Sequence, residues 1–173
     1  MYKEIVGLVP VKGFSERVPM KNLRKFAETS LYELKLDQLS KVDGFEKIII
    51  SSELDEILSI AAKKGFDTHL RDPKYSTSDV PMSEVFSYIA SEIEGENIAW
   101  INVTNPLSGP ECYSNAAKTY SQMDPKYNCL LSVCEVQDYL FYDGKPVNFK
   151  PYPWATSQDL KGLLEMTFVI NIL

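Results

Sequence analysis

Residues 5–22 read IVGLVPVKGFSERVPMKN, and this stretch decides the fold. Its first five residues form an apolar run that is typical of a buried β-strand. The loop that follows carries Lys12, Arg17 and Lys21 around Gly13, although the chain as a whole is acidic. A basic, glycine-containing loop at the carboxyl end of a first strand is where α/β proteins hold phosphates. The stretch therefore predicts a phosphate-binding loop, although a charged loop that only faces solvent would have the same composition.

Strand-like and helix-like segments alternate along the rest of the chain. The predicted strands share short apolar or β-branched runs, at 48–50, 67–70, 98–103 and 129–133. The predicted helices share apolar residues at helical spacing, at about 30–39, 52–64, 82–93 and from 110 onward. Ser30 with Glu33, and Ser52 with Asp55, predict capping boxes at two helix starts. This order predicts an α/β fold, an open and mostly parallel sheet with helices on both faces.

The alternation ends after Val136. Asp143-Gly144 predicts a hairpin turn between 140–142 and 147–149. We expect a single domain over residues 1–173 with an irregular, aromatic-rich excursion at 138–156. Clustered aromatic residues outside the α/β pattern fit an interface between two chains, and they also fit a lid that folds back on its own domain.

Composition excludes several classes of protein. The 173 residues carry a net charge of −6, which argues against a nucleic acid or an anionic membrane as partner. No apolar run reaches the roughly 18 residues of a spanning helix, and strand-like sequence begins almost at once, so we expect no signal peptide and a cytoplasmic protein. Cys112, Cys129 and Cys134 are expected to be reduced, mostly buried thiols, and His69 to be structural or on the surface.

Few motifs carry chemistry on their own. The first loop has neither the GxxxxGK[ST] spacing of a P-loop nor the GxGxxG of a dinucleotide fold, so an ATPase or a dehydrogenase is poorly supported. Asn102, Thr104 and Asn105 follow a predicted buried strand, at the edge of the sheet where ligands bind. An Asn-Pro turn before a helix would explain the same three residues.

Four segments together resemble the cytidylyltransferases that make CMP-sugar acids, the family of CMP-N-acetylneuraminate synthetase. The first loop matches that family's Ile-Pro-Ala-Arg-Gly-Gly-Ser-Lys-Arg-Ile-Pro-x-Lys-Asn pattern at Pro10, Gly13, Ser15, Arg17, Pro19, Lys21 and Asn22. Further matches follow in the family's order at 50–53, at 70–71 with 78–79, and at 102–107. Residues 157–160 also resemble a late segment of some members.

The resemblance implies a Rossmann-like nucleotidyltransferase that transfers CMP from CTP to a 2-keto sugar acid, such as a sialic acid, and releases pyrophosphate. The implied catalytic residues are Arg17 and Lys21. The implied nucleotide-binding residues are Pro10, Val11, Lys12, Gly13, Phe14, Ser15, Asn22, Arg71 and Ser78. The implied acceptor-binding residues are Asn102, Thr104, Asn105 and Gln158. The resemblance also implies a homodimer formed through the excursion, and Mg²⁺ bound with CTP.

Several positions depart from the family pattern. This chain has Lys12 where the family has an arginine, Phe14 where it has a glycine, Glu16 where it has a lysine and Ser108 where it has an arginine. The family's magnesium-binding aspartates would lie beyond Leu173, so we expect no metal ligand in this chain and slow turnover. Two alternatives therefore stay open: a nucleotidyltransferase that uses another base or a sugar phosphate, and a catalytically impaired nucleotide-binding or scaffold protein.

Overall fold

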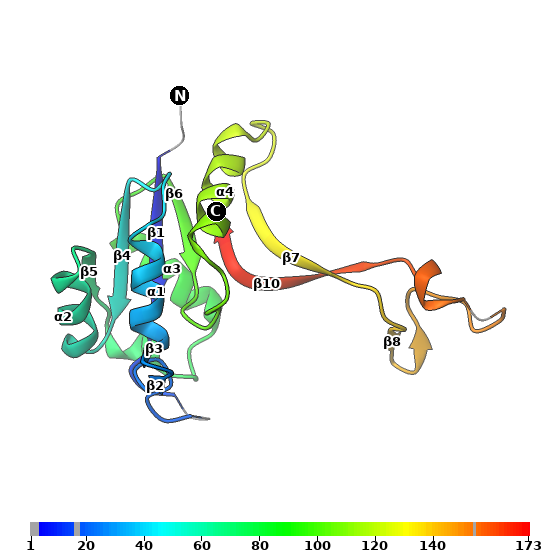
Figure 1. Ribbon diagram of the computed structural model, residues 1–173, viewed down its shortest axis with the longest axis horizontal. Helices are drawn as coiled ribbons and strands as arrows, with labels where there is room; N and C mark the ends of the chain where they lie inside the picture. Colours follow the sequence, from blue (N-terminus) through cyan, green and yellow to red (C-terminus); the bar gives the residue numbers. More distant parts are fainter. Residues whose placement is uncertain (1–3, 16–17, 154) are drawn as a thin grey trace. The chain divides into compact units, whose positions relative to one another are not determined.

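The first apolar run forms a central strand of the sheet. The computed structural model describes residues 4–15, 18–153 and 155–173, so Glu16, Arg17 and Trp154 lie outside the described residues. The strands are β1 (Ile5–Pro10), β2 (Lys25–Phe26), β3 (Thr29–Ser30), β4 (Lys47–Ser52), β5 (Asp67–Leu70), β6 (Asn97–Ile101), β7 (Leu130–Val136), β8 (Phe141–Tyr142), β9 (Lys145–Pro146) and β10 (Leu163–Ile172). The helices are α1 (Leu31–Leu39), α2 (Asp55–Lys63), α3 (Met82–Glu92) and α4 (Pro110–Gln122), with short 3-10 helices at Pro73–Ser76 and Ser157–Asp159 (Figure 1).

The main sheet is mostly parallel, as the sequence predicts. Its strand order is β5-β4-β1-β6-β10-β7. Strand β1 pairs in parallel with β4 and β6, and β4 pairs in parallel with β5. Strand β10 is antiparallel to β6, with Ile170 opposite Ile101. The parallel pairs bring the carboxyl ends of β5, β4, β1 and β6 to one edge of the sheet.

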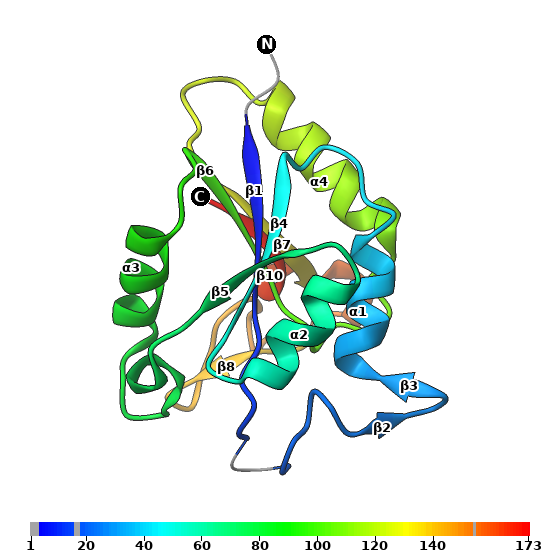
Figure 2. The ribbon, with the colours of Figure 1, turned by 90° about the vertical axis from the view of Figure 1, so that its left-hand side faces the viewer.

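Helices cover both faces of the sheet, which confirms the predicted layering. On one face, Leu36 of α1, Ile57 of α2 and Tyr113 of α4 pack in one cluster with β-strand side chains such as Ile50 and Ile101. The other face packs Val85 and Ile89 of α3 against Val6, Leu8 and Trp100. Figure 2 shows α3 on the opposite side of the sheet from α1 and α4. Within the described ranges, no helix combines the length and the apolar character that a membrane crossing requires.

The two predicted capping boxes have different outcomes. Ser30 caps α1 as predicted: its Oγ accepts from the Glu33 N–H at 3.1 Å and donates to the Glu33 carboxylate at 3.0 Å. The prediction for Ser52 is wrong, because β4 continues through Ser52 and α2 begins three residues later with Leu54 at its N-cap position. The predicted end of α2 is confirmed, since Gly65 follows it with φ of +84°.

Two compact units make up the chain, one from residues 1–130 and 169–173 and one from residues 131–168. The second unit holds the predicted hairpin turn, in which Asp143 (φ 48°) and Gly144 (φ 69°) both adopt left-handed backbone conformations. The strands of this hairpin are β8 and β9, so its second strand lies at Lys145–Pro146 instead of 147–149.

All three cysteines are exposed, so the expectation of mostly buried thiols is wrong. Cys112 lies in the first turn of α4 and faces away from the core. Cys134 lies in β7, most of whose residues are exposed or half-buried, so the apolar pattern of this strand does not make it a core strand.

Candidate functional site

A cavity of about 860 Å³ opens where the carboxyl ends of β1, β4, β5 and β6 meet. Ten residues that the sequence analysis named as site residues line it: Pro10, Lys12, Phe14, Ser15, Lys21, Asn22, Arg71, Ser78, Asn102 and Thr104. The sequence analysis assigned no role to the other lining residues, which are Glu53, Pro73, Ser76, Thr77, Asp79, Met82, Val85, Trp100 and Val103. The segments separated along the chain thus meet at the edge where an α/β sheet binds ligands.

Four of the named residues do not line the cavity. The Val11 side chain is buried in the core, and Gly13 and Asn105 lie in loops that border the cavity. Gln158 belongs to the second unit, in the short helix Ser157–Asp159. A further named residue, Arg17, lies outside the described residues, so its role stays a prediction.

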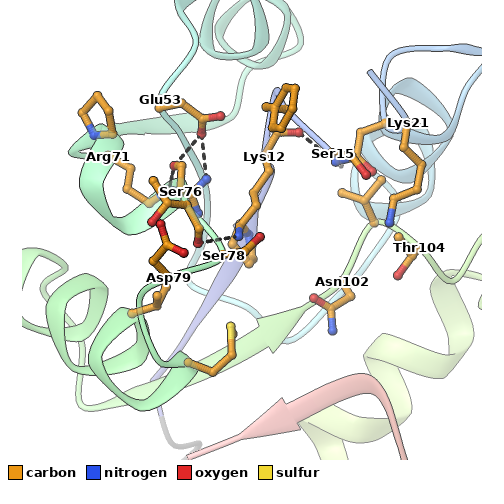
Figure 3. A pocket seen from close by; sticks show the side chains of 18 of the residues that line it. Lys12, Ser15, Lys21, Glu53, Arg71, Ser76, Ser78, Asp79, Asn102 and Thr104 are labelled. Carbon is orange, nitrogen blue, oxygen red and sulfur yellow. Dashed lines mark hydrogen bonds and ion pairs between the residues drawn. The ribbon is translucent and has the colours of Figure 1, made fainter. Parts of the chain in front are cut away.

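A buried ion pair organises one wall of the cavity. The Arg71 guanidinium donates to the Glu53 carboxylate at 2.8 Å, and their side chains are 1% and 11% exposed. Arg71 also donates to the Val11 carbonyl at 3.1 Å and to Ser76 Oγ at 2.9 Å. Glu53 accepts two further bonds of 2.8 Å, from Ser76 Oγ (Figure 3) and from the backbone N–H of Gly13. This network joins the loops after β1, β4 and β5.

The charge of Glu53 is stabilised by the same network. Burial raises the pKa of the Glu53 carboxyl, but hydrogen bonds from Arg71, from its own backbone, from Ser76 and from Gly13 outweigh burial and hold the pKa below its ordinary value. Glu53 therefore remains ionised at neutral pH. Because Glu53 neutralises Arg71, Lys12 and Lys21 are the cations without a counter-charge among the described residues that line the cavity.

Gly13 allows the first loop to approach α2 closely. A Cβ atom at this position would lie 1.9 Å from Leu54 Cδ1 and 2.5 Å from Leu54 Cγ. A real Cβ does not make contacts under 3.0 Å, so either the Leu54 side chain or the loop would have to shift. The absence of a side chain at Gly13 thus permits its N–H to reach Glu53 at 2.8 Å.

Lys12 and Lys21 supply positive charge to the cavity. Lys12 Nζ donates to the Thr77 carbonyl at 3.1 Å and so links the first loop to the segment after β5. Lys21 is half-buried and forms no ion pair with any described carboxylate. In the view of Figure 3, Lys21 and Thr104 lie on the opposite side of the cavity from Glu53 and Arg71. Two lysines that have no carboxylate partner among the described residues favour an anionic ligand.

Asn22 combines burial with an unpaired acceptor. Its side chain is 9% exposed, and its Nδ2 donates to the Lys12 carbonyl at 3.0 Å. Its Oδ1 is buried and has no hydrogen-bond partner among the described residues. A buried acceptor left unpaired costs about 1–3 kcal/mol, so this oxygen is suited to a donor brought by a ligand.

The described residues do not form a magnesium site by themselves. No group of three or more His, Cys, Asp or Glu side chains that could hold a metal occurs among them. Both carboxylate oxygens of Glu53 are engaged, which leaves Asp79 as the other described carboxylate that lines the cavity. His69 does not line it and lies 3.0 Å from Ser51 Oγ. We therefore assign no metal ligand here.

These observations define a class: an α/β protein with a basic, ligand-sized cavity at the carboxyl edge of a parallel sheet. Comparison with protein families narrows this class. The sequence model of the cytidylyltransferase family matches residues 6–153, and the chain belongs to this family. The match includes every described residue that lines the cavity.

Individual relatives are similar at low identity. The chain is 24% identical over 134 residues to the N-acylneuraminate cytidylyltransferase of Escherichia coli O18:K1:H7, a match that covers 77% of this chain and 32% of that protein. It is 23% identical over 127 residues to a pseudaminic acid cytidylyltransferase of Campylobacter jejuni, covering 69% of this chain and 54% of the relative. The chain thus spans about a third to a half of the length of these curated relatives.

Solved structures share the fold. The structure of a CMP:2-keto-3-deoxy-manno-octonic acid synthetase complexed with CTP aligns with a TM-score of 0.72 at 13% identity, over 98% of this chain and 73% of that one. A 4-diphosphocytidyl-2C-methyl-D-erythritol synthase from Anaerococcus prevotii aligns with a TM-score of 0.68 at 14% identity, over 98% and 69% of the two chains. A Mycobacterium tuberculosis protein solved in complex with manganese aligns with a TM-score of 0.54 at 15% identity, over 74% of this chain and 63% of that one. These likenesses confirm the predicted nucleotidyltransferase fold.

Proposed function

We propose that this protein binds CTP in the cavity and transfers CMP to a 2-keto sugar acid. The observation that carries the proposal is the gathering of Lys12, Lys21 and Asn22 in one cavity, within the segment that the cytidylyltransferase model matches. Relatives that act on N-acylneuraminate and pseudaminic acid support a sugar acid as the acceptor. The related synthetase complexed with CTP supports the choice of nucleotide.

The proposed reaction is an in-line displacement at phosphorus. The 2-hydroxyl oxygen of the sugar acid forms a bond to the α-phosphorus of CTP, and the bond from that phosphorus to the oxygen bridging to the β-phosphate breaks. Pyrophosphate leaves, and the hydroxyl proton passes to solvent. Such a reaction needs positioning and charge neutralisation more than covalent help from the protein.

The residues of the first loop are proposed to hold the triphosphate. Lys12 and Lys21, together with Arg17, would neutralise its charge through charge-assisted hydrogen bonds. The Gly13 N–H is already bonded to Glu53, so the N–H groups of Phe14 and Ser15 remain for phosphate oxygens. Lys21 is the residue best supported in this role, because the Lys12 ammonium already donates to the Thr77 carbonyl, whereas Lys21 has no carboxylate partner among the described residues.

Asn22 is proposed to contact the base. Its unpaired Oδ1 needs a donor, and the 4-amino group of cytosine is one, whereas the 4-carbonyl of uracil is an acceptor. With uracil in the site, the Asn22 Oδ1 would meet a second acceptor and stay unpaired. A site of this kind rejects the wrong base because a buried polar group is left without a partner. Arg71 and Ser78, whose side chains also border the cavity, are proposed to complete the nucleoside contacts. Asn102, Thr104 and Asn105 are proposed to serve the acceptor.

The second unit is proposed to mediate a homodimer. Several of its large apolar side chains are exposed: Leu131, Val133, Phe141, Tyr142, Val147, Tyr152, Leu163, Leu164 and Met166. Tyr142 and Tyr152 are 80% and 91% exposed, while Phe149 packs edge-on against Phe141 at 5.2 Å. An apolar surface of this kind favours contact with a second chain. Light scattering at micromolar concentration tests the dimer, and a monomer would contradict it.

The function is tested by measuring pyrophosphate release. The protein is incubated with CTP, UTP, ATP or GTP and with N-acetylneuraminate, pseudaminate, 2-keto-3-deoxy-manno-octonate or a sugar 1-phosphate as acceptor. We expect release that requires CTP and one of the sugar acids. Release with a sugar phosphate or another base would instead assign a different nucleotidyltransferase activity. CTP binding without any release would indicate a nucleotide-binding protein that does not catalyse transfer.

A further inference from the structure

Lys35 is a buried cation outside the cavity. It lies in the middle of α1 and is 0% exposed. Burying an ammonium is costly unless each of its three N–H groups finds an acceptor. The Lys35 ammonium has three: the Asn105 carbonyl at 2.9 Å, the Ser108 carbonyl at 3.3 Å and Tyr113 Oη at 2.6 Å. Two of its three bonds are therefore directed at the chain between β6 and α4, and the third at the first turns of α4.

The carbonyls that Lys35 binds belong to one tight turn, residues 105–108, which we call the 105–108 turn. The Ser108 N–H donates to the Asn105 carbonyl at 3.2 Å and closes the turn. Gln38, one helical turn after Lys35, donates to the Pro106 carbonyl between them at 2.7 Å. Helix α1 thus binds three of the four carbonyls of the 105–108 turn.

Apolar packing does not hold the tip of this turn. Leu107 is 98% exposed, and Pro106 and Ser108 are half-buried. The polar contacts from α1 therefore restrain where the turn lies. Because the turn directly follows Thr104, which lines the cavity, its position sets that of the acceptor-side wall.

The same helix is tied to the nucleotide side of the cavity. The Tyr32 N–H, in the first turn of α1, donates to the Asn22 carbonyl at 3.0 Å. Helix α1 therefore connects the segment that carries Lys21 and Asn22 with the 105–108 turn. A rigid element that contacts both loops fixes their separation, and misplacement by about 1 Å costs about a hundredfold in rate for a reaction between two bound groups.

We propose that Lys35 is a positioning residue for the acceptor: with Gln38 it clamps the 105–108 turn and so holds Thr104 and Asn105 in the geometry that binds the second substrate. This inference rests on the proposed function for the identity of that substrate. The clamp itself rests on the contacts of Lys35 and Gln38 alone. Burying a charge costs free energy even where it is hydrogen-bonded, so positioning gives a reason for a cation at this place that stability does not give.

The test compares two clamp variants with a control on the same helix. Lys35→Met removes the cation, and Gln38→Met removes one clamp bond together with an amide oxygen that has no partner among the described residues. The control, Tyr32→Phe, removes a buried bond of 2.8 Å from α1 to the Ile57 carbonyl in α2, away from the turn. Gln38 is half-buried, so its variant keeps the proposal testable if Lys35→Met does not fold.

Hydrogen exchange and kinetics give separate readouts. In both clamp variants we expect amide exchange in residues 103–109 to rise about tenfold, with exchange in 11–22 unchanged. With the sugar acid that the wild type uses, we expect the acceptor KM to rise about tenfold and the CTP Kd to stay within about twofold. Tyr32→Phe should change neither the loop exchange nor the acceptor KM.

The proposal would be overturned by exchange in 103–109 that both clamp variants leave unchanged, or by an acceptor KM that neither variant alters. Equal weakening of CTP and acceptor would also overturn it, because it would show a general loss of structure. If the wild type releases no pyrophosphate with any acceptor, the proposed function fails, and the exchange measurement alone then decides whether Lys35 and Gln38 clamp the turn.

Discussion

Glu53→Gln is the substitution whose effect follows most directly from the contacts around the cavity. The carboxylate accepts three bonds of 2.8 Å, from Gly13 N–H, Arg71 and Ser76. The amide keeps the shape but removes the charge, and its nitrogen replaces one accepting oxygen with a donor. Arg71, which is 1% exposed, then lies in the protein interior without a counter-charge.

The expected loss of stability is large for one neutralised carboxyl. Breaking a buried ion pair by removing one partner costs about 3–5 kcal/mol. Because the amide oxygen still accepts one bond, we expect the lower end, about 3 kcal/mol. For a protein of this size each kcal/mol lowers the Tm by about 2–4 °C, so the Tm should fall by about 6–12 °C. Differential scanning calorimetry at pH 7 measures this directly.

The matched control is Asp37→Asn, which neutralises the carboxyl of an exposed pair with Lys64. An exposed pair contributes about 0–1 kcal/mol, so this variant should lose at most about 2–4 °C. The pKa of Glu53 lies below its ordinary value, so its contribution is present above about pH 4.5 and is lost as the pH falls through the pKa of the folded state. The difference between wild type and Glu53→Gln should therefore shrink in acid. Equal Tm losses for the two variants at pH 7 would refute the reasoning.

Three further predictions concern other residues of the first unit. Gly13→Ala should destabilise the protein by about 1–3 kcal/mol in urea unfolding, because its Cβ would lie 1.9 Å from Leu54 Cδ1. Lys21→Ala should raise the Kd of CTP about tenfold to a hundredfold and that of CMP by less than about threefold in calorimetric titration, whereas the exposed Lys25→Ala should change neither. Burial lowers the pKa of Lys35 to about 8, against the opposing influence of Cys112, so the unfolded chain binds more protons between about pH 8 and 10.5. The free energy of unfolding of the wild type should accordingly rise relative to Lys35→Met across that window, and a constant difference would contradict the assigned pKa.

The fold was predictable where the signals were local. The β-branched run 48–50 and the Ser30 N-cap with Glu33 each depend on neighbouring residues, and both are confirmed. The capping box predicted at Ser52 is wrong because the preceding strand extends to the same residue. Whether Ser52 ends a strand or starts a helix depends on the pairing of β4 with β1 and β5, which the local sequence does not show. Strand β10 lay outside the predicted elements, since its antiparallel direction depends on pairing with β6.

The site was predictable only in part for the same reason. Lys12, Lys21 and Asn22 are close in sequence, so their loop could be identified from spacing and family resemblance. The Glu53–Arg71 pair joins residues 18 apart, and Lys35 reaches Asn105 across 70 residues. Neither contact has a local sequence pattern, because each arises from loops that the sheet brings together. The segment 50–53 was noticed for its resemblance, but the pairing of Glu53 with Arg71 could not be deduced from it.

The central claim is that the cavity binds cytidine nucleotides, with Asn22 accepting a hydrogen bond from the base. Calorimetric titration of the wild type and of Asn22→Ala with CTP and UTP tests this claim most directly. The account predicts that the wild type binds CTP at least about tenfold more tightly than UTP, and that Asn22→Ala removes most of this difference by weakening CTP. Equal affinity of the wild type for CTP and UTP, or a preference for CTP that Asn22→Ala leaves intact, would contradict it.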